Sequence, residues 1–380
     1  MKQAIPTQPT VTQVVNHSVH GLATIRLIDP PGRIVRSLVH DLGVSVGAAA
    51  AEPDISVRFI ERFHNAGRLR MLELNNEPFA FDDHNFYLLD DQGHRTLFNF
   101  DLSGPTIELV CERGVSKIPL LTSLLGIALL RKGHLLLHSA AFAYRGKGIL
   151  VTGWQTGGKS EMLLAYMNAG ARYIADDWTI IRGTDGALCG LTSHVNTWGW
   201  QLEQLPALRS RLSSAERFRL GLIRFYRHLY GALPLRNANR GSLPLRLLAR
   251  IDAEGARTAR TSSSPQRLFG NHVQWEPISL DRLFLANVSQ DGIAVLPVDP
   301  HDIARRMSSS QHYERRDLHE AYIKYRFAFP DRTDDALSGS LARELLLLNK
   351  TLDSRQAYEI VHPYPVSLHD LYRATETYCK

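Results

Sequence analysis

The sequence has few cysteines and no hydrophobic run long enough to cross a membrane. Its three cysteines, Cys111, Cys189 and Cys379, are far apart and form no CxxC pair, which excludes a cysteine-based metal framework and suits a reducing cytosol. The most apolar stretch, Ile118 to Leu130, is too short to span a bilayer at about 1.5 Å per residue. The N-terminus lacks an apolar signal region. We therefore expect a cytoplasmic protein that makes no membrane contact.

Lysine is missing from the most basic part of the chain. Between Arg209 and Arg267 the sequence holds thirteen arginines, no lysine and three acidic residues, whereas the whole chain carries a net charge of only +6. The basicity therefore belongs to one segment, and the overall charge does not by itself indicate nucleic acid. No nucleic-acid-binding motif accompanies the arginines, so nucleic acid is a weak candidate partner.

Part of this arginine-rich segment is predicted to be a helix. Ser213 and Glu216 form a capping box, and an apolar stripe follows it. The stripe consists of Phe218, Leu222, Phe225 and Leu229. Arg217, Arg224 and Arg227 are candidate contacts to an acidic or phosphorylated substrate. The alternative is a solvated arginine face over a buried apolar stripe.

The most specific pattern in the chain is a complete Walker A sequence at Gly153–Ser160. The apolar run Ile149–Thr152 predicts a buried strand before it, and Glu161–Met167 predicts a helix after it, which is the context that this motif needs. Its glycines let backbone N–H groups face phosphate oxygens at a helix N-terminus. The alternative is a glycine turn with an incidental lysine. The candidate nucleotide-binding residues are Gly153, Trp154, Gln155, Thr156, Gly157, Gly158, Lys159, Ser160 and Glu161. In such a loop Lys159 reaches the terminal phosphates of ATP, and the Ser160 hydroxyl is a ligand of Mg²⁺.

Two adjacent carboxylates follow at the end of a second predicted strand. Asp176 and Asp177 come directly after the apolar residues Tyr173–Ala175. A right-handed βαβ crossover from the strand at Ile149 would place both carboxylates at the sheet edge beside the Walker A loop. One carboxylate can then support the metal while the other accepts a proton from an attacking hydroxyl. The alternative is an Asp-Asp turn between strands.

A histidine precedes the Walker A loop. Leu135 to Tyr144 predicts a strand that carries His138 and lies next to the nucleotide-binding strand. Most strand histidines are ordinary core or surface residues. Near two carboxylates, however, His138 could orient or tune the basic one.

Together, His138, the Gly153–Glu161 stretch and the Ala175-Asp176-Asp177 strand end resemble the C-terminal catalytic domain of HPr kinase/phosphorylase. The resemblance covers roughly residues 134 to 181. Leu137-His138-Ser139-Ala140 follows a variant found in HPr-kinase-related proteins, some of which phosphorylate a serine on a peptide precursor. The stretch Ile-Arg-Gly-Leu-Gly-Ile, which HPr-specific enzymes carry after the Asp pair, is absent.

The resemblance implies an α/β fold with a phosphate-loop kinase core of the HPr kinase C-terminal-domain type. It implies ATP and Mg²⁺ as cofactors, and a peptide, protein or small-molecule hydroxyl as substrate. It assigns Asp176 as the base, His138 as its partner and Asp177 as the support of the metal, with Lys159 at the transferred phosphate. It also points to a homo-oligomer. Neighbouring residues on a strand point in opposite directions, so the two Asp roles could be exchanged.

We expect three parts in the 380 residues. The first part is a polar tail at residues 1–20, and the second is a small antiparallel β-rich module at 21–104. The third is the nucleotide-binding core at 105–380, with an Arg-rich helical segment at about 202–270. Ile118 to Leu130 predicts a buried helix on the sheet beside the loop. Further along, the patterns predict a hairpin from Leu283–Val288 and Ile293–Leu296, an apolar helix at Leu341–Leu348 and a last helix capped by Ser367.

Three functions are compatible with these patterns. The first is an ATP-dependent kinase that transfers the γ-phosphoryl group to a serine or another hydroxyl. The second is a nucleotide-binding switch or ATPase without a phosphoacceptor, and the third is a binding protein with a degenerate centre. A GTPase is disfavoured because the guanine-reading Asn-Lys-x-Asp pattern is absent. The second Asp and His138 favour the kinase, since hydrolysis alone would need neither.

Overall fold

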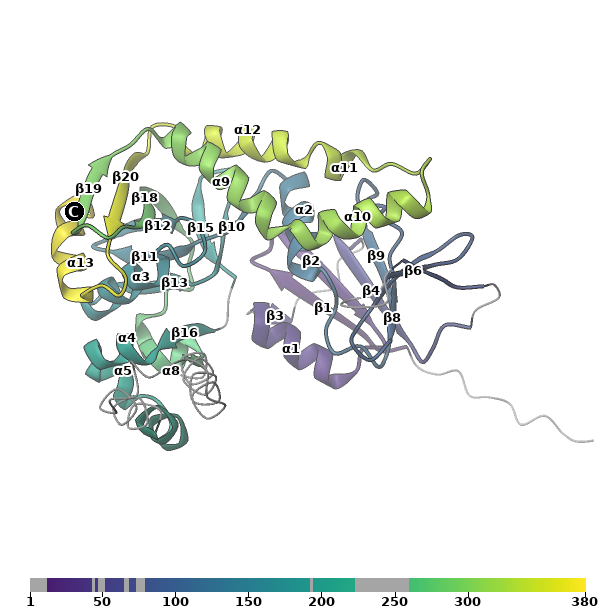
Figure 1. Ribbon diagram of the computed structural model, residues 1–380, viewed down its shortest axis with the longest axis horizontal. Helices are drawn as coiled ribbons and strands as arrows, with labels where there is room; N and C mark the ends of the chain where they lie inside the picture. Colours follow the sequence, from purple (N-terminus) through teal and green to yellow (C-terminus); the bar gives the residue numbers. More distant parts are fainter. Residues whose placement is uncertain are drawn as a thin grey trace, which may run out of the picture. The chain divides into compact units, whose positions relative to one another are not determined.

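In this computed structural model the chain forms two compact units (Figure 1). The structure describes residues 12–42, 45–46, 52–64, 68–72, 79–191, 194–222 and 260–380. The first unit comprises Met1–Leu137, Ile180–Asp185 and Ala304–Asp353, and the second comprises His138–Thr179, Gly186–Ile303 and Ser354–Lys380. The boundary predicted near residue 104 does not coincide with this division, because the first unit continues beyond it and takes in helices from the C-terminal third.

A mixed β-sheet forms the framework of the first unit. Among the described residues its strand order is β3-β1-β2-β4-β9-β8-β7-β6-β5. The strands are β1 Val14–Val19, β2 Ala23–Ile28, β3 Ser45–Val46, β4 Ile55–Ile60, β5 Arg70–Met71, β6 Phe79–Phe81, β7 Phe86–Leu89, β8 Arg95–Leu97 and β9 Ile107–Glu112. Strands β2, β4 and β9 run parallel, so the prediction of an antiparallel module was wrong here. Helix α1, Gly32–Leu42, supplies the crossover that a parallel β2–β4 pair requires.

The predicted polar tail is in part a strand. Residues Val14–Val19 form β1, which pairs antiparallel with β2, and its alternate residues His17 and Val19 are buried. The alternation of apolar and polar residues in β1 is short, which is why the composition of the segment resembled a tail. Residues 1–11 lie outside the described residues.

Helix α2, Leu121–Arg131, confirms the predicted buried helix. Its leucines Leu124, Leu125 and Leu129 are fully buried. The helix packs against β2 and β4 of the first sheet, however, and not on the sheet beside the Walker A sequence as predicted. Apolar spacing establishes that a helix is buried, but it does not say which sheet the helix covers.

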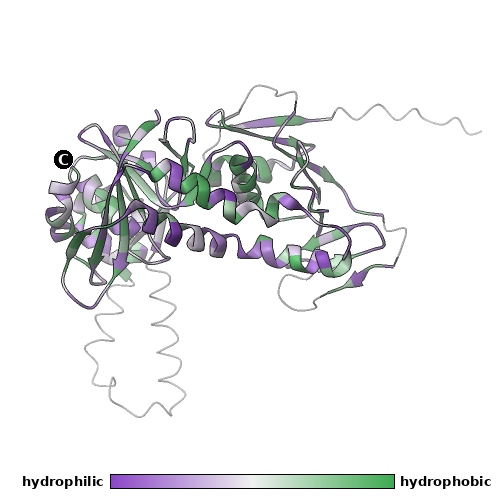
Figure 2. Ribbon diagram, turned by 90° about the horizontal axis from the view of Figure 1, so that it is seen from above, coloured by the Kyte–Doolittle hydropathy of each residue, from purple (hydrophilic) through white to green (hydrophobic). Residues whose placement is uncertain are grey.

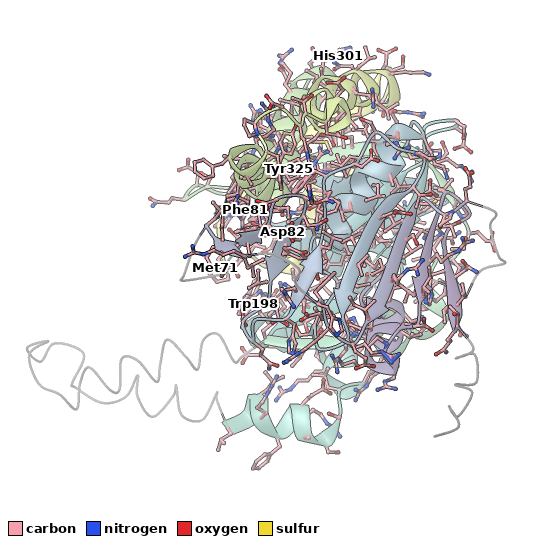
Figure 3. The ribbon with its side chains drawn as sticks, turned by 90° about the vertical axis from the view of Figure 1, so that its right-hand side faces the viewer. Met71, Phe81, Asp82, Trp198, His301 and Tyr325 are labelled. Carbon is pink, nitrogen blue, oxygen red and sulfur yellow. The ribbon has the colours of Figure 1, made fainter. Side chains whose placement is uncertain are left out.

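The C-terminal helices of the first unit are amphipathic. They include α10, Arg316–Ala328, α11, Asp335–Ser338, and α12, Ser340–Leu352, and α9, Pro300–Glu314, leads into them. Hydrophilic and hydrophobic residues alternate along the ribbon of the long helices (Figure 2). The buried residues of α10 are spaced three and four apart. One of them, Tyr325, contacts Phe329, and Phe81 of β6 contacts the same ring. Figure 3 labels Tyr325 and Phe81. Helix α12 confirms the helix predicted at Leu341–Leu348.

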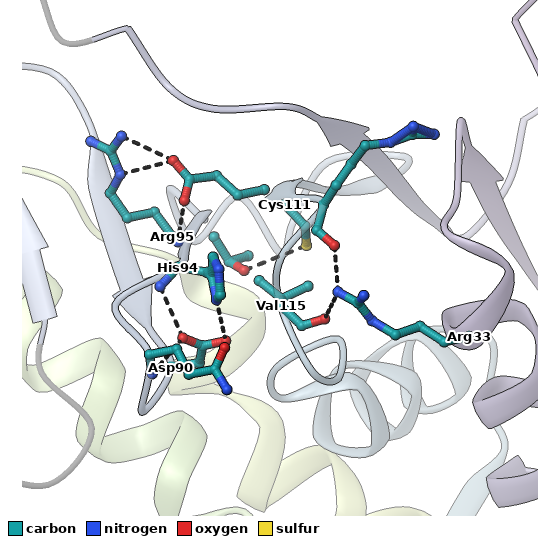
Figure 4. A network of polar contacts seen from close by, with 10 residues as sticks. Arg33, Asp90, His94, Arg95, Cys111 and Val115 are labelled. Atoms are coloured by element: carbon teal, nitrogen blue, oxygen red, sulfur yellow. Dashed lines mark hydrogen bonds and ion pairs between the residues drawn. The ribbon is translucent and has the colours of Figure 1, made fainter.

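Polar contacts tie the strand ends of this unit together (Figure 4). Arg95 forms a partly buried ion pair with Glu112 on the neighbouring strand, at 2.9 Å between Nη2 and Oε1. Arg33 of α1 donates hydrogen bonds to the carbonyl oxygens of Arg113 and Val115. These contacts fix α1 and β8 against the end of β9.

His17 is an uncompensated polar side chain in this core. It is fully buried, and within the described residues neither ring nitrogen has a hydrogen-bond partner. Burial lowers the pKa of His17 from 6.5, because it disfavours the charged ring. The unfolded chain then binds a proton that the folded chain excludes. The stability that depends on neutral His17 is therefore complete above about pH 6.5 and is lost as the pH falls toward the lowered folded value.

We accordingly expect His17→Leu to flatten the pH dependence of unfolding between pH 7.5 and 5. Urea unfolding of the variant and the parent at both pH values measures this difference. His64→Gln, at an exposed histidine of the same unit, is the matched control and should keep the parental pH dependence. A His17→Leu variant that loses as much stability on acidification as the parent would contradict the argument.

The second unit is built on a mixed sheet with the order β15-β18-β12-β11-β13, in which β20 lies between β18 and β19. Its strands are β11 Ala140–Tyr144, β12 Lys147–Thr152, β13 Arg172–Ala175, β15 Ala187–Gly190, β18 Ile278–Val288, β19 Ala294–Pro297 and β20 Gln356–His362. Strands β12, β18 and β20 are parallel neighbours. The predicted hairpin of β18 and β19 is wrong, because β20 is inserted between them. The α/β class is confirmed.

The predicted strand–helix–strand unit around the Walker A sequence is present with one strand inserted. Helix α3, Lys159–Asn168, connects β12 to β13, and both strands run antiparallel to the intervening β11. Strands β12 and β13 therefore point the same way without being neighbours. The strand predicted from Leu135 to Tyr144 divides at Ser139 into β10, Leu135–His138, and β11. Strand β10 pairs with β14, Trp178–Ile181.

Helix α13, Leu368–Thr375, closes the core of the second unit. The Ser367 side chain accepts a hydrogen bond from the Asp370 amide, which confirms the predicted cap. Helix α13 packs on α3, where the buried Tyr166 hydroxyl donates to Thr375 Oγ1 at 3.0 Å. This hydrogen bond holds α3 near its C-terminal end. In the part of the chain that the structure describes, no helix has the length and apolar character needed to cross a membrane.

Candidate active site

The Walker A residues form a tight turn, here called the glycine loop, between the end of β12 at Thr152 and the start of α3 at Lys159. Gly153 has φ +148° and Gly158 has φ +102°. A Cβ atom at Gly153 would lie 2.3 Å from the carbonyl oxygen of Ala286, and one at Gly158 would lie 1.8 Å from Nε2 of His362. Both positions therefore require glycine for conformation and for space.

The side chain of Lys159 lies across the glycine loop. It is buried, and its ammonium group donates to the carbonyl oxygens of Gly153 at 3.1 Å and Trp154 at 2.8 Å. These two carbonyl oxygens hold the charge at the loop, where α3 also presents the amides of its first turn. Trp154, Gln155 and Thr156 form the exposed part of the loop.

Ser160 and Asp176 meet directly below the loop. The Ser160 hydroxyl donates to Oδ1 of Asp176 at 2.8 Å, and Asp176 is 1% exposed. Burial, with the neighbouring Asp177 carboxylate second, raises the pKa of Asp176 to about 7, against the opposing hydrogen bond from Ser160. A bound cation would compensate this buried charge.

These two oxygens fit Mg²⁺. The ion is commonly held by one or two protein oxygens and completes its shell with phosphate oxygens and water. The described residues contain no group of three or more His, Cys, Asp or Glu side chains that could hold a metal by itself. The donor set therefore suits a cation that arrives with a phosphate ligand better than a structural metal.

Asp177 occupies a different position from its neighbour. Its backbone has φ +79°, a region that most non-glycine residues adopt at a cost and that Asp tolerates better than most. The Ser139 amide holds its carbonyl oxygen at 3.1 Å. The Asp177 carboxylate is 39% exposed, whereas Asp176 is buried.

Two side chains flank the Asp177 carboxylate. His138 Nε2 lies 4.0 Å from Oδ1, and Asn196 Nδ2 donates to Oδ2 at 3.3 Å. The contact of His138 with Asp177 was not expected from the sequence, which assigned His138 to Asp176.

Asn196 was not found from the sequence. It lies on β16, Val195–Trp198, which pairs with β17, Arg260–Ser263, in a separate two-stranded sheet. No motif surrounds it, and its contact with Asp177 depends on where β16 packs. The only signal is a polar residue on the partly exposed side of a short strand.

Glu161 anchors the first turn of α3. It is buried, and burial raises the pKa of its carboxyl. Its Oε1 accepts from Gln201 Nε2 at 2.9 Å. Gln201 belongs to α4, Gly199–Gln204, which leads into α5, Pro206–Ser210. The predicted nucleotide-binding residue Glu161 therefore fixes α4 beside the glycine loop.

The predicted arginine surface is only partly described. Arg217 is exposed on the helix at 214–222, while Arg224 and Arg227 lie outside the described residues. The capping box of Ser213 and Glu216 is confirmed by reciprocal hydrogen bonds. The prediction of a buried apolar stripe is wrong for its two described members, because Phe218 is 73% exposed and Leu222 is 57% exposed.

Neither known protein families nor curated proteins give a match to this sequence.

Proposed function

We propose that the protein is an ATP-dependent kinase that transfers the γ-phosphoryl group to a hydroxyl, with a core of the HPr kinase C-terminal-domain type. The observation that carries this proposal is the division of labour between two adjacent carboxylates. Asp176 is buried against Ser160 at 2.8 Å, and Asp177 is turned away from it into a partly exposed position between His138 and Asn196. Metal support and proton acceptance need such separate positions.

In this proposal the glycine loop and Lys159 bind the phosphates of ATP. The Lys159 ammonium exchanges the carbonyl oxygens of Gly153 and Trp154 for oxygens of the terminal phosphates, and amides of the α3 N-terminus donate to the others. Ser160 and Asp176 would hold Mg²⁺, which when bound neutralises charge on the β- and γ-phosphates. These residues position the phosphoryl group and stabilise its charge.

Asp177 is the proposed base. An acceptor hydroxyl placed beside it forms the new O–P bond while the bond between the γ-phosphorus and the β,γ-bridging oxygen breaks, and ADP leaves. The hydroxyl proton passes to the Asp177 carboxylate late in the transfer. His138 and Asn196 orient the carboxylate, one at each oxygen. The roles of the two Asp residues are therefore the reverse of those that the sequence resemblance implied.

Support for a kinase over a nucleotide switch or simple ATPase comes from the side chains around Asp177. Its carboxylate lies between His138, at 4.0 Å, and Asn196, at 3.3 Å, and metal binding by Asp176 does not require this arrangement. The acceptor is proposed only as a hydroxyl of a serine-containing peptide, a protein or a small molecule.

The proposal is tested by following the γ-phosphate of labelled ATP. With serine-containing peptides and small-molecule hydroxyls supplied as acceptors, the parent should transfer the label to an acceptor in a Mg²⁺-dependent reaction. Lys159→Ala should slow this transfer by about 10²–10³-fold, as loss of a transition-state charge partner does. Lys117→Ala, at an exposed lysine, is the control and should match the parent. Release of the label as inorganic phosphate with no labelled acceptor would assign the ATPase alternative, and a Lys159→Ala variant as fast as the control would exclude the proposed function.

A further inference from the structure

The segment that follows β20 runs beside the glycine loop. His362, the last residue of β20, is fully buried, and its Nδ1–H donates to the carbonyl oxygen of Pro363 at 2.8 Å. The ring lies against Gly158, where its Nε2 takes the place of a side chain. Gly158 belongs to the glycine loop, and His362 packs directly against it. The chain after β20 therefore begins next to the loop.

A second anchor holds the far end of this segment. Gln204 of α4 donates through Nε2 to the carbonyl oxygen of Val366 at 3.0 Å, and its Oε1 accepts from the Leu368 amide at 2.8 Å. Val366 is itself buried. The residues between His362 and Val366 are thus fixed at both ends on elements that contact α3.

Tyr364 projects from the middle of this anchored segment. It is 47% exposed, although both anchors are buried. Its ring meets Trp200 of α4 edge to face, with centroids 5.5 Å apart and planes at 85°. Trp200 is next to Gln201, which bonds Glu161 in the first turn of α3. A large aromatic surface is therefore held in a set orientation beside the helix N-terminus.

We propose that Tyr364, supported by Trp200, is the platform on which the base of the bound nucleotide stacks. The proposal rests on nucleotide binding at the glycine loop and adds the site of the base to it. An exposed ring whose orientation is already fixed loses little conformational entropy when a planar ligand covers it. The occupant is a nucleobase, because the phosphates of the same ligand are bound at the adjacent loop.

Stacking on a tyrosine ring discriminates little between bases, since every base has a π face. The platform therefore accepts adenine and guanine alike, and we expect the affinities for ATP and GTP to lie within about tenfold of each other. Trp154, 51% exposed on the loop itself, is the competing platform. Tyr364 is favoured because a second ring and two buried anchors hold it.

Binding of ATP, GTP and inorganic triphosphate, each with Mg²⁺, separates the platform from the phosphate site. Tyr364→Ala and Tyr364→Leu should weaken ATP and GTP by about 5- to 150-fold, the contribution of one stacked base, and should leave triphosphate affinity unchanged. Tyr364→Phe should retain parental affinity for all three ligands. Lys159→Ala should weaken all three alike.

The outcomes that overturn the platform are distinct from failure of the proposed function. If Tyr364→Ala and Tyr364→Leu bind ATP as the parent does while Lys159→Ala does not, the phosphate site stands and the platform is wrong. Loss of ATP affinity in Trp154→Ala instead would move the base to Trp154. A folded parent that binds neither ATP nor triphosphate would remove both proposals together.

Discussion

Replacing Asp177 with Asn is expected to slow phosphoryl transfer by about 10²–10⁴-fold while ATP affinity stays near the parental value. The range is that of a typical general base. Asparagine keeps the size of the side chain and tolerates the positive φ of this position better than most residues, so the turn should persist. The charge that accepts the hydroxyl proton is lost, whereas Ser160, Asp176 and Lys159 are untouched. Single-turnover transfer and equilibrium ATP binding measure the two effects separately.

Two further variants test whether the effect is specific to Asp177. Asp291→Asn, at an exposed loop carboxylate, should transfer phosphate at the parental rate. His138→Ala should give an intermediate loss in kcat with little change in ATP affinity, because His138 acts on the orientation of Asp177 from 4.0 Å. Parental transfer by Asp177→Asn would show that Asp177 is not the base.

Local patterns in the sequence predict the elements around the site but not their partners. The strand, glycine loop and helix at 147–168 are contiguous, and the spacing of glycine, lysine and apolar residues determines them. The insertion of β20 between β18 and β19 depends on residues more than sixty positions away. No local pattern reports that pairing, because sheet order is set by long-range packing.

The pairings inside the site depend on single torsions and on loop placement. Adjacency of Asp176 and Asp177 predicts opposite directions, but only the structure shows that Asp176 is the one that contacts Ser160. Asn196 and Tyr364 belong to segments that are brought to α3 by α4 and β20. Their residue types alone carry no motif, so only the structure places them at the loop.

Asp176→Asn is expected to lose Mg²⁺-dependent ATP affinity and to gain thermal stability. Because the folded pKa of Asp176, about 7, exceeds its ordinary 3.8, the ionised carboxylate opposes folding at pH values above its unfolded pKa. The cost of the ionised carboxylate grows from about pH 4 to pH 7 and is then constant. Asparagine keeps an acceptor for the Ser160 hydroxyl without the charge. We expect the variant to be more stable than the parent above pH 7.

Thermal unfolding at pH 4 and pH 8, without nucleotide, tests the stability effect. The difference between Asp176→Asn and the parent should be small at pH 4 and large at pH 8. Asp177→Asn is the matched control, since it makes the same change of side chain at a carboxylate that is 39% exposed. A variant less stable than the parent at pH 8 would show that the buried charge is compensated within the protein.

The measurement that tests the central claim most directly is a calorimetric titration of ATP into the folded parent, Asp176→Asn and Asp177→Asn, each with and without Mg²⁺. The account predicts that Mg²⁺ tightens ATP binding to the parent and to Asp177→Asn by the same factor. It predicts that Asp176→Asn loses this gain. Equal Mg²⁺ dependence in both variants would contradict the separation of the two carboxylates, and absence of ATP binding to the folded parent would contradict the account as a whole.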